Sequence, residues 1–141
     1  MKYNQQIDIE CDLAALPAMR VFIRQFCENL SHPKLTDEKI HQIELAAHEL
    51  VANIIQHADL NPSKDKIKIS ATSNHLSEEH PTLEILFLDH GKAFNPKDAP
   101  DPQFDENSVG GFGLYIIEQF IDEVIYQRVN GQNLTYIKVH L

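Results

Sequence analysis

The sequence predicts an α+β fold in which helices cover a mixed β-sheet. The expected elements follow the order β-α-α-β-β-α-β-β, so that the two long helices are grouped together. The later strands come in pairs joined by polar segments, which is typical of hairpins. Grouped helices and hairpin-linked strands together indicate the α+β arrangement.

The first strand and the first helix are expected near the N-terminal end. Apolar side chains alternate with polar ones over part of residues 3–11, as in a strand. Residues 13–30 then repeat apolar side chains at helical spacing. Pro17 fits this helix only if it lies in the first turn, because a later proline would break the hydrogen-bond ladder. The predicted buried stripe is Met19, Phe22, Ile23, Phe26 and Leu30.

The second helix has the clearest boundaries. Thr36 is a favourable N-cap, and the two acidic residues after it suit the positive end of the helix dipole. Apolar residues then step by three and four, and the helix is expected to end near Ala58. The side chains predicted to face the core are Ile40, Ile43, Ala47, Leu50 and Ile54.

The second half is predicted to contain four strands and one helix. Strands are expected at residues 66–73 and 82–89, followed by a loop at 90–109 that contains three prolines. A loop of that length in a compact domain is usually functional or mobile. Residues 110–121 begin with glycines and continue as an apolar helix, and the chain ends in a hairpin with a turn at 130–133.

Length and charge limit the classes of function. At 141 residues the chain is expected to form one domain over residues 1–141, and 43 % hydrophobic residues is ordinary for a globular protein. The formal net charge of −9 argues against a nucleic-acid-binding surface, which would need a basic patch. An acidic protein that binds an anion usually does so through backbone N–H groups or a metal ion. Alternatively, the acidic surface suits a basic protein partner.

Location and redox state are predicted from what the sequence lacks. No apolar run approaches the roughly 20 residues of a membrane span, and the N-terminal segment has no apolar stretch typical of a secretion signal. Cys11 and Cys27 lack metal-type spacing and are expected to be reduced thiols. We therefore expect a cytoplasmic protein with no membrane segment.

Three polar side chains share one ridge of the second predicted helix. Glu49, Asn53 and His57 are spaced by four residues, and each such step advances only about 40° around a helix. An amide oxygen is a hard ligand suited to Mg²⁺, and a carboxylate one turn away can orient or deprotonate a nucleophile. A solvated polar ridge is the alternative, and this helix alone does not decide between the two.

Glycines occur in two segments about twenty residues apart, at 89–96 and at 110–114. They suggest one binding site that is lined on two sides by glycine-containing backbone. Asp89 ends a predicted strand, so its carboxylate could accept a hydrogen bond from an amino group such as that of adenine. Gly91 would let a flat ring lie close to the backbone. Residues 110–113 precede a helix, where free N–H groups and the helix dipole favour phosphate. Taken separately, each segment is also compatible with an ordinary tight turn.

Together, and in this order, these segments resemble the anti-sigma-factor serine/threonine kinase family, within the GHKL ATPases that share the Bergerat ATP-binding fold. "ELVANIIQHA" (49–58) resembles the N box of that family, and "DHGKAF" (89–94) resembles its Asp-x-Gly box. "GGFGLYIIEQFIDEV" (110–124) resembles the second glycine box, and "NGQNLTYIKV" (130–139) resembles the closing hairpin. The resemblance covers nearly the whole chain. It implies a two-layer sandwich with a mixed, mostly antiparallel sheet covered on one face by about three helices.

The resemblance implies a role for each matching residue. Asn53 would hold Mg²⁺, and Glu49 would be the general base or an orienting group. Asp89 would bind the amino group of adenine, with Gly91 beside the ring and Phe94 as the aromatic residue of the same box. The flexible wall over the phosphates would be formed by Gly110, Gly111 and Gly113.

The function implied by the resemblance is an ATP- and Mg²⁺-dependent serine/threonine protein kinase, acting as an anti-sigma regulatory factor in a partner-switching pathway. It would phosphorylate a STAS-type antagonist, bind a sigma factor or another regulator, and form a homodimer, as family members often do. An alternative is a nucleotide-gated binding module with little or no kinase activity. Some kinases of the family carry a basic residue just before the second glycine box, where this chain has Asn107, Ser108 and Val109.

A second metal-binding hypothesis concerns another face of the same helix. His41, Glu44 and His48 are spaced by three and four residues and could together approach one ion. No third strong ligand accompanies the two histidines, which are two turns apart. A polar or partly buried helix face is the alternative.

Overall fold

Five strands form one sheet in the computed structural model, which describes residues 3–76, 79–95 and 113–141. Their order across the sheet is β1-β2-β3-β5-β4, and each neighbouring pair of these described strands runs antiparallel. The predicted mostly antiparallel pairing is confirmed, but the expectation of a mixed sheet is wrong for the described strands, because none of their pairs is parallel. The strands are β1 (Tyr3–Glu10), β2 (Lys66–Ser73), β3 (Thr82–Asp89), β4 (Glu123–Val129) and β5 (Gln132–His140).

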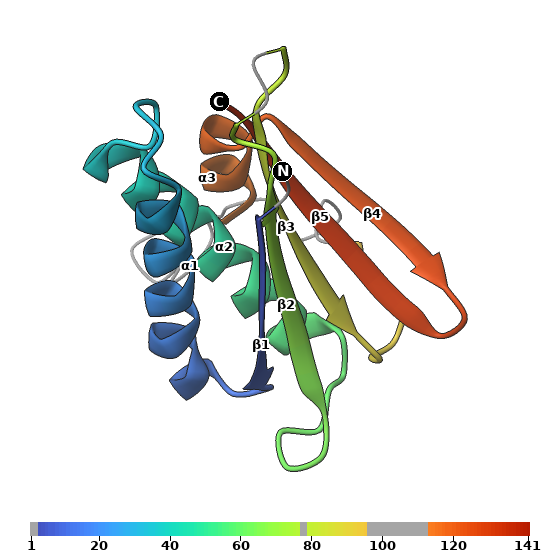
Figure 1. The fold of residues 1–141 in the computed structure, drawn as a ribbon. Coiled ribbons are helices and arrows are strands. Elements are labelled where there is room, and N and C mark those ends of the chain that lie inside the picture. The colour runs from blue at the N-terminus through green and yellow to red at the C-terminus, as the bar shows by residue number, and fades with distance from the viewer. Residues whose placement is uncertain (1–2, 77–78, 96–112) are drawn as a thin grey trace.

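In the described residues, three helices cover one face of this sheet, which gives the expected two-layer sandwich (Figure 1). Pro17 lies in the first turn of the first helix, as its missing N–H requires. None of the helices in the described parts of the chain combines the length and the hydropathy that a membrane span needs. The helices are α1 (Leu16–Leu30), which follows a 3₁₀ turn at Leu13–Ala15, α2 (Asp37–His57) and α3 (Gly113–Phe120).

The core lies between the helices and the inward face of the sheet. Alternate residues of the strands point toward the helices, and the central strands contribute Ile67, Ile69, Leu83, Ile85, Phe87 and Ile137. The fully buried side chains from α1 and α2 include Met19, Ile23, Phe26, Ile43 and Leu50. Burial of this apolar surface is the main favourable contribution to folding. Polar residues at inward positions of the strands therefore need a separate explanation.

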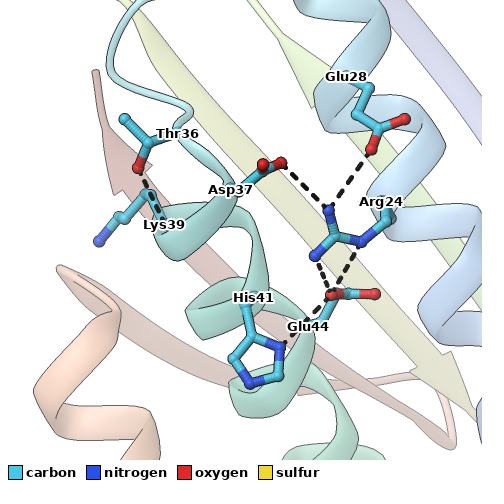
Figure 2. A network of polar contacts seen from close by, with 7 residues as sticks. All are labelled: Arg24, Glu28, Thr36, Asp37, Lys39, His41 and Glu44. Atoms are coloured by element: carbon cyan, nitrogen blue, oxygen red, sulfur yellow. Dashed lines mark hydrogen bonds and ion pairs between the residues drawn. The ribbon is translucent and has the colours of Figure 1, made fainter.

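Arg24 on α1 joins the two long helices through a charged network (Figure 2). Its guanidinium donates to one carboxylate oxygen of Glu44 on α2, from Nη2 at 2.8 Å and from Nε at 3.2 Å. Nη1 faces Glu28 at 3.4 Å and Asp37 at 3.7 Å. Because Glu44 is only 6 % exposed, these hydrogen bonds offset the cost of burying its carboxylate and fix how α1 lies on α2.

The start of α2 is capped as predicted and is also tied to α3. The Thr36 hydroxyl accepts a hydrogen bond from the Lys39 N–H at 3.1 Å. The Lys39 ammonium donates to the carbonyl of Phe120, the last residue of α3, at 2.9 Å. A cation at a helix C-terminus is favoured by the helix dipole, so this contact holds α3 against α2.

The hairpin between β4 and β5 closes more tightly than predicted. Its turn consists of Asn130 and Gly131, with positive φ values of 50° and 77°, and pairing resumes with Gln132 opposite Val129. Asn-Gly is the preferred sequence for such a two-residue turn. The predicted turn at 130–133 is wrong at its C-terminal side, because Gln132 and Asn133 already belong to β5.

Candidate functional site

The end of α2 meets the end of β3 at Gly91. The Lys92 N–H donates to the carbonyl of Ala58, the residue that caps α2, at 2.8 Å. A Cβ on Gly91 would lie 2.2 Å from the Ala58 carbonyl oxygen and 2.9 Å from the Ala58 Cβ. Only glycine permits two backbones to approach in this way. The contact seen here is with α2, and a flat ring beside Gly91 stays a prediction.

Asp89 is the last residue of β3 and is buried, with 1 % of its surface exposed. Its Oδ1 accepts one hydrogen bond from the Gly91 N–H and one from the Asn133 side-chain amide, both at 2.9 Å. The first closes a tight turn after the strand, and the second comes from β5, where Asn133 is directly opposite. Because Oδ1 takes both bonds, Oδ2 is the oxygen suited to accept from a bound molecule.

Sequence reasoning missed three residues near Asp89, namely Tyr126, Arg128 and Asn133. Arg128, Asn133 and Asp89 form one cross-strand row through β4, β5 and β3. Arg128 Nη1 donates to the Asn133 side-chain oxygen at 2.9 Å and to the Gly91 carbonyl at 2.7 Å, and the Tyr126 hydroxyl donates to the same Asn133 oxygen. One sequence signal was available, because Asn133 takes an inward position of the alternating β5 pattern, where an apolar residue is expected.

Glu49 and Asn53 lie one turn apart on α2, as predicted. Asn53 is 9 % exposed and Glu49 is half-buried. Within the described residues, neither side chain has a hydrogen-bond or ion-pair partner. A buried amide and a half-buried carboxylate are costly to leave unpaired, so a ligand or solvent must satisfy them. Neither side chain is among the fully enclosed polar atoms without a partner in the described residues, so solvent or a ligand can reach both. Ligand contact at this ridge stays a prediction.

The ridge continues to His57, whose ring lies against Phe94. The two ring centroids are 5.1 Å apart and the planes are tilted by 31°. Phe94 also packs against the core, so the aromatic residue of the Asp-x-Gly segment sits on the ridge that carries Asn53. Along the helix axis, Asn53 is about 7.5 Å from Ala58. Side chains from both predicted motifs therefore converge on the C-terminal half of α2.

The second glycine segment is described only in part. Gly113 is the first residue of α3, which packs against the helix that carries Glu49 and Asn53. Gly110 and Gly111 lie outside the described residues, as do residues 96–109 of the predicted long loop. Their proposed contacts with phosphate stay predictions.

The second metal-binding hypothesis is not supported. His41 Nδ1 lies 3.9 Å from Glu44 Oε2, but the same oxygen accepts hydrogen bonds from Arg24. His48 Nδ1 is buried and has no hydrogen-bond partner in the described part of the chain. Over residues 3–76, 79–95 and 113–141, no three His, Cys, Asp or Glu side chains gather closely enough to hold a metal ion. The polar helix face, the alternative reading, is the better description.

The two cysteines are free and buried, which agrees with the expected reduced thiols. Burial raises the pKa of the Cys11 thiol to about 11 and the pKa of the Cys27 thiol to about 12. Because the thiolate is the reactive form, both side chains are inert at neutral pH. Neither cysteine is a candidate nucleophile.

A family model and sequence relatives of this chain both indicate a kinase-like ATPase domain. Residues 9–139 match the histidine kinase-like ATPase domain. The chain is 28 % identical to the serine-protein kinase RsbW of Bacillus licheniformis over 72 % of its own length and 65 % of that protein, slightly under two thirds of the relative. It is 27 % identical to the serine-protein kinase RsbW of Bacillus subtilis over 98 % of its own length and 88 % of that protein.

A solved structure shows the same fold. The structure of the RsbU and RsbW domains of a Mycobacterium tuberculosis protein aligns with a TM-score of 0.63 at 15 % identity, covering 96 % of this chain and 32 % of that one. This likeness shows the fold, and together with the match to the histidine kinase-like ATPase domain it supports the predicted GHKL-type architecture. The sequence relatives confirm the resemblance to the serine kinase family that the motifs indicated. Because the match extends over nearly all of its residues, the chain belongs to the histidine kinase-like ATPase domain family.

Proposed function

We propose that this chain is an ATP- and Mg²⁺-dependent serine/threonine protein kinase that acts as an anti-sigma regulatory factor. Residues 1–141 would act as a single ATP-binding kinase domain in the cytoplasm. The names of the relatives, which are serine-protein kinases, support the activity. The two free, buried cysteines suit a reducing compartment.

The observation that carries the proposal is the state of Glu49 and Asn53. Both lie on one face of α2 and lack partners within the described residues. The same helix ends against the Asp89 turn, through the hydrogen bond between Lys92 and Ala58. A nucleotide with its base at Asp89 would run back along α2, so that its phosphates approach Asn53 and then Glu49.

The proposed reaction transfers the γ-phosphoryl group of ATP to a hydroxyl of a partner protein. The serine or threonine oxygen attacks the γ-phosphorus, the bond to the bridging oxygen breaks, and ADP leaves with the electron pair. Glu49 takes the hydroxyl proton on a carboxylate oxygen. Phosphoryl transfer depends mainly on positioning and on stabilising charge, which side chains on a rigid helix can provide.

The residues present fit a magnesium ion. The Asn53 amide offers a hard oxygen donor, and it is accessible and makes no hydrogen bond among the described residues. Mg²⁺ in nucleotide sites is usually held by one or two protein oxygens together with phosphates and water, so a single protein ligand is compatible with it. When bound, the ion would neutralise charge on the phosphates.

An Asn53→Ala variant should bind Mg-ATP about tenfold more weakly than the wild type, because it loses an oxygen that contacts a charged group. Binding of ATP in EDTA should change little, since only the metal-dependent part is removed. Calorimetry with and without Mg²⁺ measures both quantities. Asn29→Ala on the exposed face of α1 is a matched control. Unchanged Mg-ATP affinity in Asn53→Ala would refute the assignment.

An Asp89→Asn variant should lose adenine nucleotide binding. Its oxygen would stay with the Gly91 and Asn133 donors, so its NH₂ group would face the amino group of adenine. Two opposed donors in a buried site cost about 1–3 kcal/mol, which weakens ATP binding roughly 5- to 150-fold. Competition calorimetry with ATP and GTP tests this, with exposed Asp8→Asn as the control. If the wild type binds ATP and GTP equally well, Asp89 does not select adenine over guanine.

The proposed substrate is a STAS-type antagonist, with a sigma factor or another regulator as a second partner and a homodimer as the assembly. The net charge of −9 suits a basic partner surface.

The direct test is transfer of labelled γ-phosphate from Mg-ATP to a serine or threonine of the antagonist. ATP binding without transfer would favour the nucleotide-gated binding module, which the absence of a basic residue at 107–109 also favours.

A further inference from the structure

At the end of the sheet, the Arg128 guanidinium is linked to the buried Asp89 carboxylate through the side-chain amide of Asn133. Arg128 lies on the edge strand β4, Asn133 lies in the middle on β5, and Asp89 ends β3. Asp89 and Asn133 are each only 1 % exposed. Arg128 and Asn133 also hold the turn after β3, through the carbonyls of Gly91 and Lys92. The hydrogen bond from Asn133 to the Asp89 carboxylate is not needed for that and requires its own explanation.

The Asn133 amide has one permitted orientation. Its oxygen accepts from the Tyr126 hydroxyl and from Arg128 Nη1. Its NH₂ group donates to Asp89 Oδ1 and to the Lys92 carbonyl, both at 2.9 Å. A flipped amide would set donors against donors on one side and acceptors against acceptors on the other. The neighbours therefore hold the NH₂ group toward Asp89.

Because the Asn133 amide lies between Arg128 and Asp89, only one carboxylate oxygen of Asp89 is bonded to the row, and Oδ2 stays available. A direct arginine–aspartate pair is often bidentate and would occupy both carboxylate oxygens. Here Arg128 instead donates to the Asn133 oxygen and to the Gly91 carbonyl, and the Asn133 amide donates to Oδ1 of Asp89. Oδ1 is thereby fixed between two N–H donors, which also fixes the direction in which Oδ2 points.

We propose that Asn133, held in place by Arg128, is a positioning residue that sets the base specificity of the site. This inference rests on the nucleotide site proposed above. An amino group at position 6 of a purine donates to Oδ2, whereas an oxo group there would face the carboxylate oxygen with its own lone pairs. The discrimination depends on a fixed carboxylate, because an Asp89 side chain free to rotate would no longer hold Oδ2 at the base.

Adenosine and inosine diphosphates test this directly, because a 6-amino group in one is replaced by a 6-oxo group in the other. The full chain should bind ADP more tightly than IDP. In Arg128→Gln and Asn133→Leu variants the ratio of the two affinities should fall by about fivefold or more, with IDP binding little changed. Calorimetry gives the affinities, and thermal melting shows that each variant is folded. Arg20→Gln on α1 controls for the loss of a positive charge.

The outcomes separate the inference from the proposed function. The inference would be overturned if the folded Arg128→Gln protein kept the wild-type ratio of ADP to IDP affinity, or if its affinities for ADP and IDP fell equally. Either result would show that the row has only a structural role. Wild-type protein that binds neither diphosphate would overturn the nucleotide site, and the inference with it. Arg128 is at an exposed strand position, so its variant should stay folded and decide the matter even if Asn133→Leu unfolds.

Discussion

Phosphorylation of the partner hydroxyl should fall by roughly 10²–10⁴ in a Glu49→Gln variant, while its affinity for Mg-ATP stays near that of the wild type. Glutamine keeps the size of the side chain and an oxygen that accepts hydrogen bonds, but it cannot take the proton. Glu49 has no partner within the described residues, so the substitution breaks no internal contact there. Initial rates with labelled ATP and calorimetry on the same preparation measure the two effects.

Glu38→Gln is the matched control for Glu49→Gln. It removes the same charge from the same helix, at an exposed position in the first turn. A Glu49→Gln protein that transfers phosphate at the wild-type rate would end the catalytic assignment. A loss of only a few-fold would make Glu49 an orienting group, since the loose transition state needs little help from a base. A joint fall in melting temperature and ATP affinity would indicate a structural role.

A Gly91→Ala variant should be strongly destabilised. Its Cβ would lie 2.2 Å from the Ala58 carbonyl oxygen, and neither backbone can yield without losing the hydrogen bond from Lys92 to that oxygen. Overpacking of this kind costs about 1–3 kcal/mol or more, which lowers the melting temperature by roughly 3–12 °C for a chain of this size. Nucleotide affinity should fall too, because the same shift displaces the Gly91 N–H from Asp89.

Gly131 provides the control for that experiment. A Cβ there would meet no atom within 4 Å, and asparagine tolerates the positive φ of 77° at this position. Gly131→Asn should therefore melt close to the wild type. If Gly91→Ala also melts like the wild type, the close approach of β3 to α2 is incorrect.

Much of the fold was predictable because its signals are local. Helix α2 is marked by its Thr36 cap and its apolar stripe, and the strands are marked by alternation, so each element needs only its own residues. The turn length of the last hairpin was missed because Gln132 and Asn133 are turn-like residues that pairing with neighbouring strands places in β5. Tertiary context decided that boundary.

The candidate site was predictable only where one short segment carries it. Glu49 and Asn53 share a helix, and Asp89 shares a turn with Gly91, so local spacing marked them as candidates and the family resemblance implied their roles. The partners of Asp89 were hidden, because Asn133 is 44 residues further along and meets it only through the register of β3 and β5. The steric reason for Gly91 was hidden likewise, since it depends on a helix that ends more than thirty residues earlier.

The fixed length of helix α2 limits where related sequences can gain or lose residues. It contacts α3 through Lys39 near its start and the β3 turn through Ala58 at its end, with Asn53 between them. Its 21 residues form a rod of roughly 30 Å, in which one inserted residue would turn everything beyond it by about 100°. Insertions and deletions should therefore accumulate during evolution in connections such as 59–65 and 74–81, whereas the length of α2 should stay constant.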